Sequence, residues 1–93
     1  MKGAWYVYIV ECNDGTLYTG ITNNIDKRIR DHNSGIGSRY TKGRRPVKLL
    51  TKLDCADKSH AAKMEYRIKR LSRGGKLGAI MRMEKTKGEG ELD

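Results

Sequence analysis

The most constraining feature of this chain is a pair of strand-forming runs separated by a three-residue turn. Residues 4–12 and 16–21 are rich in aromatic and β-branched side chains, and Asn13, Asp14 and Gly15 lie between them. This pattern predicts a β-hairpin. Because glycine is the third residue of the turn, we expect a type I turn closed by Gly15 in the left-handed conformation, with residue 12 opposite residue 16.

This register decides which side chains share a face of the hairpin. It places Tyr8 opposite Gly20 and Val10 opposite Tyr18. Because side chains alternate along a strand, Tyr6, Tyr8, Tyr18 and Gly20 would project from one face, with Tyr8 and Tyr18 as diagonal neighbours roughly 7 Å apart. A two-residue loop would instead place the two tyrosines on opposite faces.

The rest of the chain predicts one small domain of mixed α/β (α+β) class, with the element order β-β-α-β-α-α. A chain of 93 residues is long enough for a single modest core. We expect the domain to cover residues 1–83, followed by a disordered charged tail over residues 84–93. After the hairpin the expected elements are a helix over 25–33 capped by Thr22, Asn23 or Asn24, a mobile basic loop over 35–45, a strand over 47–53, a helix over 58–72 and a short helix over 76–83.

Positive charge is concentrated in the expected domain. The chain has 20 Lys and Arg against 11 Asp and Glu, a net charge of +9, and its last ten residues carry −2, so residues 1–83 carry +11. Such a body attracts polyanions, of which nucleic acid is the commonest, although charge alone indicates association and not chemistry. The expected contacts are Lys27, Arg30, Arg39, Lys42, Arg44, Arg45, Lys69, Arg70 and Arg73. Tyr40 could stack on an unpaired base, but a loop-anchoring role is favoured.

The N-terminal apolar run is too short to span a bilayer, so no membrane partner is expected. Cys12 and Cys55 are far apart and lack a paired spacing, which favours free thiols in a cytoplasmic protein. These two cysteines could join His32 and His60 in a zinc site. No pair of the four has short ligand spacing, so ordinary structural roles are the better interpretation.

Charged side chains interrupt the inward stripes of both longer helices. The first stripe contains Arg28 and His32 beside Ile25 and Ile29, and the second contains Glu65. An unpaired buried charge costs several kcal/mol, so these residues lie at the edge of the stripe, form a structural salt bridge or serve a function. If they meet the tyrosine face, they supply a proton acceptor, a phosphate clamp and a metal ligand for phosphodiester hydrolysis.

The sequence resembles the GIY-YIG nuclease superfamily, most closely its small stand-alone bacterial members. Residues 6–8 and 18–20 stand where the family has its two tripeptides. Arg28 matches the catalytic arginine, His32 matches a position that is His or Tyr in relatives, and Glu65 resembles the metal-binding glutamate. Five positions agreeing in order are a far more specific signal than either tripeptide alone.

The resemblance implies a three-stranded, mainly antiparallel sheet flanked by helices and a metal-dependent endonuclease acting on nucleic acid, with DNA as the first expectation. Glu65 would hold Mg²⁺ or Mn²⁺, Arg28 would stabilise charge on the phosphate, and His32 would share proton transfer or orient a tyrosine. Tyr18, or Tyr8 and Tyr18 as a pair, would help to deprotonate the attacking water. Tyr6 and Gly20 would shape the site, because a side chain at residue 20 would fill the space opposite Tyr8.

The tripeptides depart from the family pattern. Tyr6 replaces the first glycine and Thr19 the isoleucine, some relatives have lysine where this chain has Ile21, and no asparagine follows Asn33. The alternative interpretation is therefore a nucleic-acid binding module of the same fold with little or no catalysis.

Overall fold

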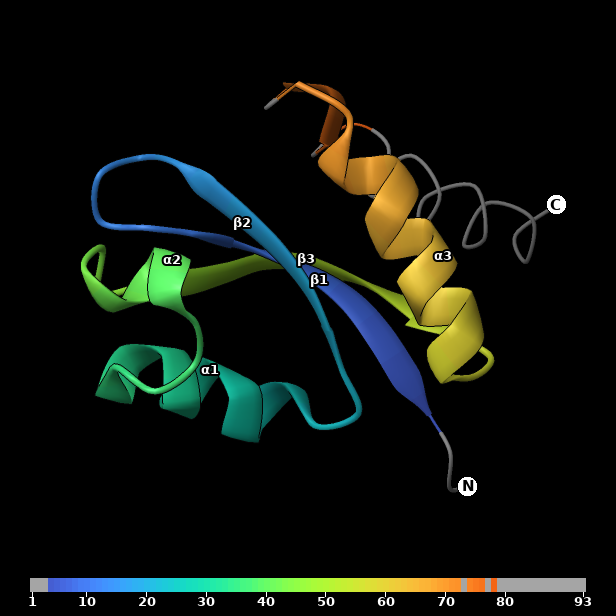
Figure 1. Ribbon diagram of the computed structural model, residues 1–93, viewed down its shortest axis with the longest axis horizontal. Coiled ribbons are helices and arrows are strands. Elements are labelled where there is room, and N and C mark those ends of the chain that lie inside the picture. Colours follow the sequence, from blue (N-terminus) through green and yellow to red (C-terminus); the bar gives the residue numbers. More distant parts are fainter. Residues whose placement is uncertain (1–3, 73, 77, 79–93) are drawn as a thin grey trace, which may run out of the picture.

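The protein is an α+β structure built on a three-stranded antiparallel sheet (Figure 1). The computed structural model describes residues 4–72, 74–76 and 78, and the statements below refer to these residues. The strands are β1 (Trp5–Glu11), β2 (Leu17–Thr22) and β3 (Lys48–Cys55), in the order β2-β1-β3. The helices are α1 (Ile25–Ser34), α2 (Arg39–Lys42) and α3 (Lys58–Lys69). The expected fold class is confirmed.

The hairpin has the register that the turn predicts. The Cys12 amide donates to the Thr16 carbonyl at 2.8 Å, and Gly15 has φ of +85°. Tyr8 therefore pairs with Gly20 and Val10 with Tyr18. The prediction of a three-residue loop is confirmed, and both tyrosines project from one face of the sheet.

Helices cover both faces of the sheet, so the central strand β1 is buried on both sides. Val7 and Ile9 pack with Ala61 and Ile68 of α3. On the other face, the cluster around Tyr8 and Val10 includes Ile25 and Ile29 of α1. Figure 1 shows the same division, with α3 on one side of the sheet and α1 and α2 on the other. Neighbouring residues of β1 thus contribute to two different cores.

The expectation of a continuous loop over residues 35–45 was wrong, because α2 forms within it. The Ser38 side chain caps α2 by accepting a hydrogen bond from the Thr41 amide at 3.2 Å. Thr41 is 0% exposed. A single buried polar residue gives no apolar periodicity, which is why the pattern of side chains did not predict this helix.

The other expected boundaries shift by a few residues at most. Asn24 caps α1 by accepting from the Lys27 amide at 3.1 Å, and α1 ends at Gly35, which has φ of +90°. α3 is capped by Asp57 and ends at Lys69 instead of Ser72. Leu71, two residues beyond the end of α3, is 41% exposed.

Residues 74–76 and 78 are helical, while the rest of the expected helix over 76–83 and the tail over 84–93 lie outside the described residues. Within the described part of the chain, no helix has both the length and the apolar character needed to cross a membrane.

Candidate active site

Tyr8 and Tyr18 lie side by side in the candidate site. Their ring centroids lie 6.4 Å apart, close to the separation expected for diagonal neighbours. A Cβ atom built on Gly20 would lie 2.5 Å from the Tyr8 hydroxyl oxygen and 3.1 Å from the Tyr18 ring. Residue 20 must therefore lack a side chain, as predicted. The atom that occupies the space is the hydroxyl of Tyr8 itself.

His32 lies directly behind the Tyr8 hydroxyl. Its imidazole is 0% exposed, and its Nε2 atom is 2.7 Å from the Tyr8 oxygen. On the other side of the ring, Nδ1 is 2.8 Å from the Thr41 hydroxyl oxygen. Burial lowers the pKa of His32, and the nearby charge of Arg28 lowers the same pKa further. The imidazole is therefore neutral near pH 7.

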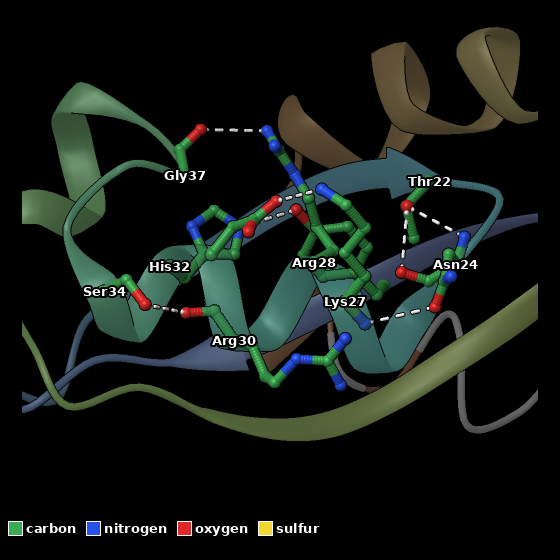
Figure 2. Close-up of polar contacts among 10 residues, drawn as sticks. Thr22, Asn24, Lys27, Arg28, Arg30, His32, Ser34 and Gly37 are labelled. Atoms are coloured by element: carbon green, nitrogen blue, oxygen red, sulfur yellow. Dashed lines mark hydrogen bonds and ion pairs between the residues drawn. The ribbon is translucent and has the colours of Figure 1, made fainter.

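Arg28 brings positive charge and hydrogen-bond donors to the same hydroxyl. Burial raises the pKa of Tyr8 to about 12, and Arg28 opposes this shift through hydrogen bonding and charge. The Arg28 Nη2 group donates to the Gly37 carbonyl at 2.9 Å, as Figure 2 shows. Its Nε atom is buried and has no hydrogen-bond partner among the described residues. The guanidinium thus keeps one unused donor next to a protonated phenol.

Glu65 approaches the tyrosines from α3. Its Oε2 atom is 3.2 Å from the Lys69 ammonium, which lies 5.8 Å from the centre of the Tyr18 ring. The negative charge of Glu65 is close enough to contribute to the raised pKa of Tyr8. Within the described residues no hydrogen bond or ion pair joins Glu65 to Arg28, so the structural salt bridge considered above does not form.

A divalent metal would find a single carboxylate here. The described residues contain no group of three or more His, Cys, Asp or Glu side chains able to hold a metal ion. Cys12, Cys55, His32 and His60 therefore do not come together as a zinc site. Mg²⁺ commonly binds through one or two carboxylates together with waters and substrate phosphates. The donor set of Glu65 fits that mode, provided that Lys69 releases the carboxylate.

Residues of the segment between α1 and β3 complete the site, and the sequence patterns identified Tyr40 and Arg44 among them but not Gly37 or Thr41. The Tyr40 ring stacks on Tyr18 at 5.8 Å with an interplanar angle of 23°, and the Arg44 guanidinium lies 4.0 Å from the Tyr40 ring centre. Gly37 packs so closely on His32 that a Cβ atom would overlap the imidazole. The one available signal was Ser38, a typical helix cap placed three residues before Thr41. Tyr40 anchors this segment, as the favoured interpretation held.

Tyr6 lies further along β1, beside the start of α1. It lines a shallow hollow together with Asn24 and Ile25, and the Lys52 ammonium lies 5.0 Å from its ring centre. The structure therefore places Tyr6 on the tyrosine face but next to the helix cap, not at the hydroxyl cluster.

The basic side chains expected to bind nucleic acid fall into two groups. The partnered ones include Arg44, which donates to Asp14 at 3.0 Å and to the Tyr40 carbonyl at 2.8 Å. Two others form ion pairs, Lys27 with Asp31 and Lys69 with Glu65. Arg45 donates a hydrogen bond to the Lys42 carbonyl, and Arg70 donates one to the Tyr66 hydroxyl.

The second group consists of exposed cations. Arg30, Arg39 and Lys42 are exposed, and no side-chain hydrogen bond or ion pair is found for them within the described residues. Figure 2 shows Arg30 pointing to the opposite side of α1 from Arg28. Arg73 lies outside the described residues.

The chain combines a tyrosine hairpin, an arginine and a histidine on α1 and a glutamate on α3 in one α+β domain, and comparison with known domains assigns it to a nuclease family. The GIY-YIG catalytic domain matches residues 4–77, and the chain belongs to this family. It is 55% identical over 85 residues to a UPF0213 protein of Desulfotalea psychrophila, covering 90% of this chain and 77% of that protein.

Two solution NMR structures are similar to this one. The UPF0213 protein BH0048 from Bacillus halodurans is 44% identical, with a TM-score of 0.52 and coverage of 84% of this chain and 83% of that one. The protein EF2693 from E. faecalis is 32% identical, with a TM-score of 0.63 and coverage of 89% and 88%. The resemblance inferred from the motifs is thereby confirmed.

Proposed function

We propose that this protein is a metal-dependent endonuclease that hydrolyses nucleic-acid phosphodiester bonds at Tyr8, Tyr18, Arg28, His32 and Glu65. The observation that carries the proposal is the buried Nε donor of Arg28, which has no partner within the described residues and lies beside the Tyr8–His32 pair. A buried donor without a partner costs about 1–3 kcal/mol. A phosphate oxygen would match the positive charge of this guanidinium and could accept hydrogen bonds from it.

The tyrosines and His32 would handle the proton of the attacking water. Tyr18 is half-buried and therefore within reach of solvent and substrate, whereas Tyr8 is buried with a neutral imidazole behind it. A proton lost from the Tyr8 hydroxyl passes to Nε2 of His32, and the phenolate can then take a proton from water. Arg28 stabilises both the phenolate and the negative charge that develops on the phosphate.

Glu65 would hold the divalent ion, Mg²⁺ or Mn²⁺. When bound, such an ion supplies positive charge that stabilises the developing charge on the phosphate oxygens. Lys69, which pairs with Glu65 at 3.2 Å, would then be free to contact the nucleic-acid backbone. The exposed cations Arg30, Arg39 and Lys42 would add salt-dependent contacts with DNA.

A cytoplasmic location belongs to the same proposal. It is supported by Cys12 and Cys55, which are both free thiols buried in the fold.

Glu65→Gln is the test of this function. We expect the protein to nick supercoiled plasmid DNA in the presence of Mg²⁺ or Mn²⁺, and the variant to lose nicking by about 100-fold or more because its amide is a poor metal ligand. Asp54→Asn is the matched control, since it removes the same charge from an exposed carboxylate on β3, at the edge of the sheet opposite β2. Equal nicking by the Glu65→Gln variant and the unmodified protein would remove the mechanism.

One observation favours the alternative function, a nucleic-acid binding module without catalysis. The carboxylate of Glu65 is already neutralised by Lys69, as in an ordinary ion pair between residues four apart on a helix. If this pair persists in the complex, the protein binds plasmid DNA but does not nick it with either metal. The same plasmid assay, read together with a gel-shift measurement, separates the two functions.

A further inference from the structure

Thr41 is the residue on the far side of His32 from Tyr8. Its side chain is 0% exposed, and its hydroxyl oxygen lies 2.8 Å from the Nδ1 atom of His32. The proposed proton transfer uses the other nitrogen, Nε2, and assigns no role to this contact. Because a buried polar side chain is retained at a cost, the contact between Thr41 and the imidazole calls for an explanation.

The hydrogen bonds around Tyr8 determine where its hydroxyl hydrogen points. Among the described residues, the acceptor within hydrogen-bond distance of the Tyr8 hydroxyl is the Nε2 atom of His32, at 2.7 Å. The Arg28 guanidinium also lies beside this hydroxyl but has only donors. Tyr18 and Glu65 act on Tyr8 through charge and make no hydrogen bond with its hydroxyl. Tyr8 therefore donates to Nε2, and Nε2 carries no hydrogen.

The second nitrogen of the ring must then carry the proton. A neutral imidazole has one N–H donor and one bare nitrogen, so a bare Nε2 requires hydrogen on Nδ1. That N–H points at the Thr41 hydroxyl oxygen, which must accept it. Thr41 can do so because its own hydrogen has another acceptor, the Ser38 carbonyl at 3.3 Å.

The reverse arrangement leaves a buried hydrogen without an acceptor. If Thr41 donated to Nδ1, the N–H of His32 would be on Nε2 and would point at the Tyr8 oxygen. The Tyr8 hydrogen would then have no acceptor among the described residues, at a cost of about 1–3 kcal/mol. These four groups form a series of hydrogen bonds that runs from Tyr8 through His32 and Thr41 to Ser38. Every donor in the series has an acceptor only when each group donates to the next one.

We infer that Thr41 is a positioning residue that holds His32 in the Nδ1–H tautomer, so that the bare Nε2 atom faces Tyr8 and can receive its proton. The tautomer is a property of the resting protein. The catalytic consequence rests on the proposed function, because it matters only if Tyr8 loses its proton during hydrolysis.

The segment that carries Thr41 is built to keep it in place. Ser38 caps α2 through the Thr41 amide, and the Ser38 hydroxyl lies 3.1 Å from the Thr41 hydroxyl. Gly37 lets the backbone pack directly on the imidazole, and its carbonyl accepts from Arg28 at 2.9 Å. One short segment therefore positions the histidine and the arginine together.

The tautomer can be read directly by ¹H–¹⁵N NMR of His32 in the metal-free protein. We expect hydrogen on Nδ1 and a bare Nε2 in the unmodified protein at pH 7–8. Hydrogen on Nε2, or a doubly protonated ring, would overturn the inference without any variant. Because this measurement needs no substrate, it stands even if the protein proves to have no nuclease activity.

Two variants test whether Thr41 is responsible, one that keeps the size of the side chain and one that keeps its hydroxyl. Thr41→Val removes the hydroxyl, and we expect the Nδ1–H form to lose its dominance. Thr41→Ser restores the hydroxyl and should restore the spectrum. An unchanged tautomer in Thr41→Val, or a Thr41→Ser spectrum like that of Thr41→Val, would overturn the role of Thr41.

Nicking kinetics test the catalytic consequence separately. We expect Thr41→Val to lower kcat by roughly ten-fold or more with little change in KM, and Thr41→Ser to recover most of the loss. A Thr41→Val variant with a changed tautomer and unchanged kcat would overturn the catalytic role. Absence of nicking by the unmodified protein would refute the proposed function while the NMR result stands.

Discussion

Gly20 shows how one residue without a side chain can organise a site. A methyl group at this position would lie 2.5 Å from the Tyr8 oxygen and 2.7 Å from its Cζ atom, so Tyr8 would have to move. Tyr8 is buried and bonded to His32, so its ring cannot shift without breaking that hydrogen bond. The requirement for glycine is therefore steric, and it arises from the pairing register of β1 and β2.

Gly20→Ala is expected to lower the free energy of unfolding by about 1–3 kcal/mol, the usual cost of overpacking a core. The same change should weaken nicking strongly, because Tyr8 is pushed from His32. Gly43→Ala is the matched control, since its Cβ atom would meet nothing within 4 Å. Urea unfolding of both variants measures the difference, and equal stabilities would contradict the steric argument.

The residues of the tyrosine face could be predicted from the sequence for a physical reason. The turn glycine sets the register, the register sets the alternation, and alternation assigns each tyrosine to a face. Arg28 and Glu65 were identifiable because a charge in an apolar stripe is unusual. What these patterns could not reveal is a partner that comes from another element, such as Thr41 behind His32, because such contacts depend on how the elements pack.

Among the helices and strands, α2 is the one that the sequence pattern did not predict. It has only four residues, it lies between glycines and basic residues, and its one fully buried side chain is a threonine. Helix periodicity needs two or more turns to be recognised. Tertiary contacts hold α2 instead, through the Tyr40 stack on Tyr18 and the Thr41 bond to His32.

Tyr40→Leu tests the importance of these contacts. Loss of the stack on Tyr18 and of the Arg44 contact should lower the free energy of unfolding by about 1 kcal/mol and reduce nicking as well. Tyr66→Leu is the control, because Tyr66 also has an arginine over its ring, at 5.4 Å, but is 64% exposed on α3. We expect the control to change stability by less than about 0.5 kcal/mol, as surface substitutions usually do. The anchoring role would be refuted by similar losses in the two variants.

For the whole molecule, the net charge of +9 predicts that the proposed binding of nucleic acid weakens as ionic strength rises. The exposed cations of α2 lie on the same side of the sheet as Tyr8 and His32 (Figure 1). Other exposed cations, such as Lys63 and Arg67, lie on α3 on the other side. The two groups allow the bound face to be determined with variants of equal charge.

The double variant Arg39→Gln with Lys42→Gln should reduce the slope of log affinity against log salt for duplex DNA by up to about 2, since each phosphate contact contributes about 0.9. The double variant Lys63→Gln with Arg67→Gln removes the same two charges from α3 and should leave the slope nearly unchanged. Fluorescence anisotropy at several salt concentrations gives both slopes. A larger effect from the α3 pair would place the nucleic acid on the other face.

The alternation of β1 between two cores makes the turn at residues 13–15 intolerant of a change in length. One residue inserted there would shift the register of β2 by one residue and turn each of its side chains to the opposite face of the sheet. Tyr18 would then point toward the aliphatic core under α3, and Thr19 toward His32. The aliphatic core under α3 would receive a phenol, and the face that carries Tyr8 would lose one. The length of this turn is therefore more tightly constrained than the identity of most residues in the hairpin.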